Sequence, residues 1–186
     1  MWLYLPAMLR RLPLYLCLLV LTQCSHCKRE DPQPAPPQNP VSLLPPETQT
    51  GQRTFGCLVN GQAWNLAGSP LGGPLFTSQY YSGHLSLAAS GLTADGKSSG
   101  GVIQIGIDKI TAVGRYTLIG KDTSFVSYDD ARTNCLYHTT ALHPAMVEIT
   151  RLDLVNRIVA GRFSFTLETP GCRPVVVTDG RFDSRF

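Results

Sequence analysis

Charged side chains are scarce in this chain of 186 residues, since Asp, Glu, Lys and Arg make up only 16% of it, well below the usual quarter. From Arg53 onward, twelve Lys or Arg stand against ten Asp or Glu, and the two signs are mixed along the sequence. The sequence has no basic cluster that would attract a phosphate backbone. We therefore expect no nucleic-acid partner.

Catalytic motifs are also absent from the sequence. There is no G-x-S-x-G nucleophile turn, no H-E-x-x-H zinc motif and no glycine-rich phosphate loop. The D-x-D-x-D-G calcium pattern is missing too, so Asp122, Asp129 and Asp130, with Asn134 nearby, predict an acidic loop in solvent. We therefore expect a non-enzymatic protein without metal or other cofactor; a hydrolase with two facing carboxylates is the enzymatic alternative.

The sequence has a single long apolar run, at residues 12–21 near the N-terminus. It has about half of the roughly 20 residues that a transmembrane helix needs, and two arginines precede it. This pattern predicts a cleaved signal peptide over residues 1–23.

A cysteine follows the apolar run. The tetrapeptide LTQC (21–24) resembles the lipobox of bacterial lipoproteins, in which the cysteine thiol receives a diacylglycerol after cleavage. We therefore predict that Cys24 is lipidated and that the lipid holds the protein on a membrane. Gln23 departs from the pattern, because a small residue usually precedes the cysteine. Ordinary secretion, an uncleaved anchor, and a metal or redox site made of Cys24, His26 and Cys27 are the alternatives.

Residues 24–52 have the composition of a linker. Seven prolines lie between Pro32 and Pro46, among polar residues and without apolar periodicity. Such a segment favours extended polyproline II structure, so it predicts a disordered stalk that holds a folded domain away from the membrane. The charged cluster at residues 28–31 is typical either of a signal for export to the cell surface or of a solvated spacer.

From residue 53 to residue 186 the proline-rich composition gives way to short runs in which apolar and polar residues alternate. These runs predict one antiparallel β domain. Asn60-Gly61 between two apolar runs predicts a type I′ hairpin turn. In residues 157–168 the apolar side chains alternate with polar ones, as in a half-buried strand. The last run, residues 174–186, puts Val176, Phe182 and Phe186 on one face. Eight or nine strands of this kind predict an all-β sandwich or barrel.

Four cysteines remain after the signal peptide and the lipidated position are set aside: Cys27, Cys57, Cys135 and Cys172. Cys27 lies in the linker, and Cys57 shares a strand face with apolar residues, where a small thiol packs well. An exported chain meets an oxidising compartment, so we predict a disulfide between Cys135 and Cys172. Pairing of Cys57 with one of them, or a metal site in which His138 and His143 join them, are the alternatives.

Aromatic residues are the candidate ligand contacts. Trp64, Tyr80, Tyr81 and Tyr128 are expected at strand ends or in loops, where flat rings stack on sugars or contact another protein. The competing interpretation places these rings in the core. A glycan or a protein is therefore the expected partner besides the membrane, and a carbohydrate-binding accessory module is the alternative function.

Four segments together suggest a family: TFGCLVNG (54–61), ITRLD (149–153), GRFSFT (161–166) and TDGRFD (178–183). They resemble a family of uncharacterised bacterial lipoproteins with a domain of unknown function, a lipobox, a flexible tail and one β-rich domain. The resemblance spans residues 54–186 and implies an outer-membrane lipoprotein of the cell envelope, facing either the periplasm or the surface. It implies no catalytic residues. The expected function is a non-catalytic binding or structural role.

Overall fold

A computed structural model describes residues 39–67, 74–93 and 101–186, which belong to one compact unit comprising residues 38–186. The predicted signal peptide, Cys24, Cys27 and the proline-rich residues up to 38 lie outside the described residues. The described residues of this unit contain eleven strands and one short 3-10 helix: η2 (Pro40–Leu43), β1 (Thr54–Val59), β2 (Gln62–Leu66), β3 (Phe76–Tyr81), β4 (His84–Thr93), β5 (Gly101–Ile107), β6 (Gly114–Leu118), β7 (Phe125–Asp130), β8 (Cys135–His138), β9 (Ala145–Asp153), β10 (Ile158–Leu167) and β11 (Val175–Arg185).

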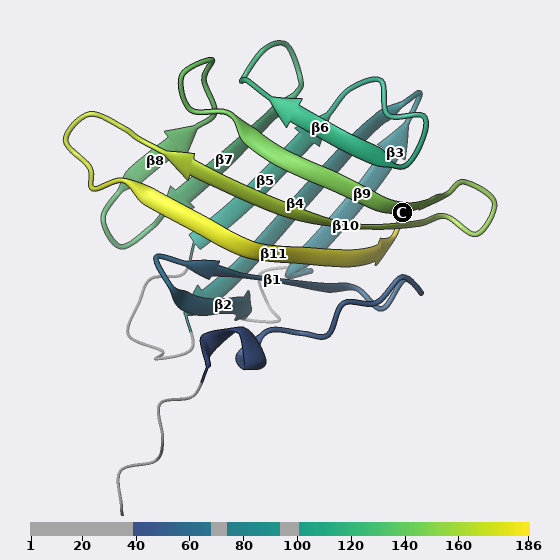
Figure 1. The fold of residues 1–186 in the computed structure, drawn as a ribbon, viewed down its shortest axis with the longest axis horizontal. Helices are drawn as coiled ribbons and strands as arrows, with labels where there is room; N and C mark the ends of the chain where they lie inside the picture. Colours follow the sequence, from purple (N-terminus) through teal and green to yellow (C-terminus); the bar gives the residue numbers. More distant parts are fainter. Residues whose placement is uncertain (1–38, 68–73, 94–100) are drawn as a thin grey trace, which may run out of the picture. The chain divides into compact units, whose positions relative to one another are not determined.

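All strand pairs are antiparallel, and they form one curled sheet in the order β6-β9-β10-β11-β1-β2-β4-β5-β7-β8, with β3 paired to the free part of β4. Figure 1 shows β6, β9, β10 and β11 in front of β3, β4, β5 and β7, so that the two halves of the sheet face each other. The predicted all-β, barrel-like class is confirmed.

The space between the two halves is filled by side chains. Phe55 of β1 packs against Trp64, Phe76 and Phe163, with ring centroids 4.9 to 5.9 Å apart. Ile103, on the facing half of the sheet, is fully buried in the same cluster. Because aromatic and branched side chains pack tightly here, the sheet encloses a core, and the cavities described below lie on its outer surface.

The local patterns predicted for the first hairpin and for residues 157–168 are confirmed. Asn60 and Gly61 both have positive φ, at 50° and 79°, and connect β1 to β2 with Val59 opposite Gln62. In β10 the burial alternates from Gly161 onward, with Phe163 and Phe165 inside and Arg162 outside, whereas Ile158, Val159 and Ala160 are all buried at a register shift against β9. A half-buried antiparallel strand with one wet face therefore forms here.

The prediction for the last strand is wrong in one respect. Val176 is 41% exposed, whereas Val175 and Val177 are buried, so Val176 does not share the core face with Phe182. The pairing register shifts between Phe163 and Phe165 of β10, opposite a bulge in β11. An extra residue reverses the side-chain alternation, and the residue with positive φ there is Asp179.

The sequence also hid two strands. β3 and β7 flank β4 and β5, so eleven strands form where eight or nine were expected. Asp129 and Asp130 therefore belong to the end of a strand and not to an acidic loop. Asp130 accepts hydrogen bonds from the backbone N–H groups of Arg132 and Thr133, which turns the chain toward β8.

The end predicted for the linker also needs correction. Residues 39–52 are folded: η2 packs on the outer face of β1 and β2, where Leu44 contacts Leu58 and Ala63. Apolar contacts and hydrogen bonds described below hold residues 44–52, which we call the strap. The folded unit thus begins before residue 53. Within the described ranges, no helix is long and apolar enough to span a membrane.

Cys57 lies in the core as expected, with no accessible surface and with burial raising the pKa of its thiol. We expect Cys57 to react with iodoacetamide about a hundredfold more slowly in the native protein than in guanidinium, because the attacking thiolate is both rare and inaccessible. Peptide mapping after timed labelling measures this rate. Equal labelling of the Cys57 peptide in both conditions would contradict the buried placement.

Candidate functional site

The strap crosses the outer face of the sheet from β2 to β9. Asn65 of β2 donates to the carbonyl of Leu43 (3.0 Å), and at the far side Arg151 of β9 donates to the carbonyl of Gln49 (2.5 Å). Between these points, Glu47 lies over β10. An extended piece of this chain therefore already occupies part of the outer face.

One buried carboxylate fastens the strap. Asp183 of β11 is 1% exposed and accepts hydrogen bonds from the hydroxyl of Thr48 (2.6 Å) and from the backbone N–H groups of Thr50 (3.0 Å), Gly51 (2.7 Å) and Gln52 (3.1 Å). Burial by itself would raise the pKa of Asp183, but these four donors outweigh it and leave the pKa below its usual value. Asp183 thus has a structural role in holding the strap.

Four side chains stand opposite one another across four neighbouring strands on the outer face, and we call them the arginine row. Arg115 of β6 is opposite Glu148 of β9, Glu148 is opposite Arg162 of β10, and Arg162 is opposite Arg181 of β11. Directly opposed side chains in an antiparallel sheet project to the same side and lie close together. Arg162 and Arg181 therefore form a pair of like charges.

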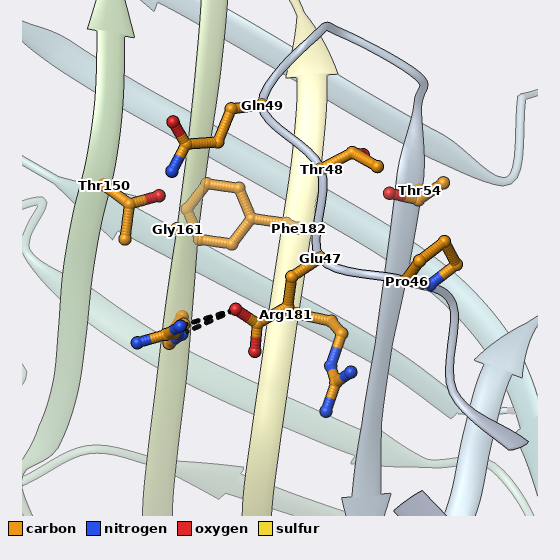
Figure 2. Close-up of a pocket in the computed structure, with 10 residues that line it drawn as sticks. Pro46, Glu47, Thr48, Gln49, Thr54, Thr150, Gly161, Arg181 and Phe182 are labelled. Carbon is orange, nitrogen blue, oxygen red and sulfur yellow. Dashed lines mark hydrogen bonds and ion pairs between the residues drawn. The ribbon is translucent and has the colours of Figure 1, made fainter. Parts of the chain in front are cut away.

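Glu47 of the strap lies beside this pair of like charges. Nε and Nη2 of Arg162 donate to Oε2 of Glu47, at 2.9 and 2.6 Å, and Figure 2 shows Glu47 beside Arg181 with these two hydrogen bonds as dashed lines. The hydrogen bonds from Arg162 lower the pKa of Glu47, and Glu47 in turn raises the pKa of Arg162. One strap carboxylate thus compensates the repulsion within the row.

Two adjoining surface pockets share Glu47, Arg162 and Arg181. One of about 170 Å³ lies beneath the strap, and Gly161 and Phe182 form part of its wall. The other, about 470 Å³, extends over the row to Arg115 and Glu148, with Asp179 on its rim. The two pockets together form a polar groove on the outer face.

The remaining hydrogen-bonding capacity of the row is on Arg181 and Arg115. The guanidinium of Arg181 donates only long hydrogen bonds, to the carbonyls of Asp179 (3.3 Å) and Pro45 (3.4 Å). Arg115, whose side chain is 75% exposed, has its ion-pair partner Glu148 at 3.7 Å. Since a guanidinium carries five N–H donors, both can bind a further acceptor.

The four aromatic residues proposed as ligand contacts do not come together. Trp64 and Tyr128 are in the core, and Tyr80 packs against the tilted ring of Phe186 with its hydroxyl donating to the Ile110 carbonyl. Of the four, only Tyr81 is well exposed. A single stacking platform is therefore not formed by these rings. The positions of these four residues in the sequence did not indicate which face of the sheet would be buried.

The predicted disulfide between Cys135 and Cys172 is present and ties β8 to the turn before β11. Both thiols are consumed by this bond, so the alternative metal site with His138 and His143 loses two of its ligands. His143 lies 3.7 Å from Glu168. Among the residues that the structure describes, no group of three or more His, Cys, Asp or Glu side chains is arranged to hold a metal ion.

Another polar cluster lies at the turn between β3 and β4. Nδ1 of His84 and Oδ1 of Asp108 are 2.6 Å apart, and Thr123 donates to the other oxygen of Asp108. Hydrogen bonds from Thr123 and His84 lower the pKa of Asp108. The cluster joins β4, the end of β5 and the loop before β7 through the contact of His84 with Asp108.

The groove residues were missed at the sequence level for a topological reason. Alternation already placed Arg162 on the solvent-exposed face. Whether Arg115, Arg162 and Arg181 lie side by side depends on which distant segments of the chain pair with one another. Glu47 fell within the expected linker. The motif TDGRFD does contain Arg181 and Asp183, two residues of β11 that bind the strap through hydrogen bonds.

Comparison with known proteins gives one finding. Residues 71–184 match a family model described as a domain of unknown function (DUF6252). No curated protein and no solved structure matches the chain. The matched region runs from just before β3 to the penultimate residue of β11, so it contains the arginine row and Asp183, while the strap, β1 and β2 precede it. The chain therefore belongs to the family of this domain of unknown function, DUF6252.

Proposed function

We propose that this protein is a lipid-anchored component of the bacterial cell envelope, attached through Cys24, and that its β domain has a non-catalytic binding role on the outer face of the sheet. The apolar run at residues 12–21, the cysteine that follows it and the proline-rich segment support the anchor. The disulfide between Cys135 and Cys172 suits an oxidising compartment such as the periplasm or the cell surface.

The observation that carries the binding role is the contrast between the interior and the outer face. The interior is packed with aromatic and branched side chains, whereas the arginine row lies in an open groove with six charged side chains in its lining. A ligand would accordingly be held at the surface by polar contacts. A carbohydrate-binding role gains no support from Trp64 and Tyr128, because both rings are buried.

Mass spectrometry of the N-terminal peptide, from protein isolated out of its own membranes, tests the anchor. We expect a peptide that begins at Cys24 and carries a diacylglycerol, and we expect the C24S variant to remain unmodified and to leave the membrane fraction. The matched control is C27S, which should stay lipidated and membrane-bound. An unmodified N-terminal peptide with a free Cys24 thiol would refute the anchor and reopen the metal and redox alternatives for Cys24, His26 and Cys27.

A further inference from the structure

The arginine row carries more positive than negative charge. Its four members comprise three guanidinium groups and one carboxylate, Glu148. Arg162 and Arg181 are directly opposed, an arrangement that destabilises a sheet unless an anion lies nearby. Glu47 supplies one such anion, and Asp179 lines the same groove, so three carboxylates stand among the three arginines. Arg162 already binds one carboxylate of this chain, which an incoming carboxylate would replace.

The strap shows which kind of molecule fits this face. Residues 44–52 run across the strands in an extended path, and their contacts alternate between backbone carbonyls and a carboxylate. The Pro45 carbonyl accepts from Arg181, Glu47 binds Arg162, and the Gln49 carbonyl accepts from Arg151. The acceptors come from successive odd-numbered residues and the donors from successive strands. This is the geometry of an extended peptide with one carboxylate that lies across arginines of three neighbouring strands.

The strap leaves part of the row uncovered. The larger pocket, about 470 Å³, extends from Glu47 past Glu148 to Arg115 at the edge strand β6. Arg181 and Arg115 have only long contacts, so both ends of the groove offer guanidinium donors to an incoming acceptor. A ligand with a single carboxylate would merely replace Glu47, whereas one with several would also engage these ends.

From these contacts we propose that the groove over Arg115, Arg162 and Arg181 binds an extended acidic peptide segment of a partner protein, and that Glu47 of the strap competes with this peptide for Arg162. The inference rests on the proposed binding role of the outer face and names the partner's chemistry. A carboxylate of the peptide must displace Glu47 before it can bind Arg162. The strap therefore lowers the affinity for weakly acidic peptides, while strongly acidic peptides still bind. Glu47 is thus a built-in competitor.

The test is fluorescence anisotropy of labelled hexaglutamate added to the full-length protein in detergent. We expect saturable binding, weakened about tenfold by R162Q and by R181Q, because each variant removes a charged donor. E47Q is expected to strengthen binding several-fold, because it frees the donors of Arg162. R132Q is the matched control, since it removes the same charge from an exposed turn beyond the groove, and it should leave the affinity unchanged.

R115Q covers the case in which the central variants fail to fold. Arg115 lies on the edge strand with an exposed side chain that pairs with Glu148 of β9, so R115Q should fold normally and still weaken hexaglutamate binding. Circular dichroism checks the fold of each variant. Absence of binding to both the wild type and E47Q would overturn the proposal, as would equal weakening by R132Q. Tighter binding of polyglucuronate than of hexaglutamate would overturn the peptide as the ligand.

The proposal of a lipid anchor and the proposal of a peptide site can be refuted independently of each other. Anisotropy in detergent does not depend on the lipid, so an unmodified Cys24 would refute the proposed attachment and leave the peptide measurement intact. Conversely, a lipidated Cys24 together with no hexaglutamate binding would leave the anchor standing and refute the ligand class.

Discussion

Replacing Asp183 with alanine is expected to lower the free energy of unfolding by about 3 kcal/mol, because the change leaves four donors of the strap without their buried acceptor. D183N should cost about 2 kcal/mol, since an amide keeps the shape but turns two N–H donors toward backbone N–H groups. Urea unfolding followed by fluorescence measures both. The control is D179N, which removes the same charge four residues away, at an exposed position whose positive φ asparagine tolerates.

The same carboxylate gives stability a defined dependence on pH. The folded-state pKa of Asp183 lies below its value in the unfolded chain, so its contribution is fully present above the ordinary aspartate pKa of about 3.9. That contribution is lost as the pH falls below this value and through the folded-state pKa. The difference in free energy of unfolding between the wild type and D183N should therefore become smaller as the pH is lowered. A constant difference between pH 7 and pH 3 would contradict the assigned role of Asp183.

Removing the disulfide is expected to have the larger effect. The bond between Cys135 and Cys172 closes a loop of 37 residues, for which chain entropy predicts about 4 kcal/mol of stabilisation. The double variant C135A/C172A should lose close to this amount in guanidinium unfolding. Reductant should destabilise the wild type and leave the double variant unchanged.

Two hydrogen bonds connect the same two segments as the disulfide and remain when the disulfide is removed. Thr169 donates to the Leu136 carbonyl and Tyr137 donates to the Arg173 carbonyl, both at 2.8 Å. They keep β8 beside the turn before β11, so we expect the folded state to survive and the loss to come mainly from the freer unfolded chain. C57A, which removes the buried unpaired thiol, is the control for cysteine replacement without loss of a cross-link. Separate, alkylatable Cys135 and Cys172 peptides from unreduced protein would contradict the pairing.

Local signals in the sequence were enough to predict the strand class and several faces. The Asn60-Gly61 turn and the alternation in β10 follow from backbone sterics and from period-two burial, which act over a few residues. The disulfide followed from counting cysteines in a chain that we predicted to be exported. None of these required knowledge of which distant strands would pair.

Predictions that depended on distant contacts were incomplete or wrong. The bulge in β11 reversed the side on which Val176 lies, because a bulge depends on the partner strand as much as on its own residues. Residues 44–52 looked like linker by composition, yet Asp183, more than 130 positions later, holds them on the domain. The arginine row is likewise a product of register, which sequence alternation alone does not fix.

The place of β11 in the sheet sets the order in which the domain can be completed. β11 is the last strand of the chain, yet it lies between β10 and β1, and it also supplies the acceptor for the strap. Until β11 is available, the first hairpin and the β9-β10 hairpin have no common neighbour, and the sheet stays in two pieces. A chain emerging in sequence order must therefore remain incompletely folded until β11 is available to join the two pieces of the sheet.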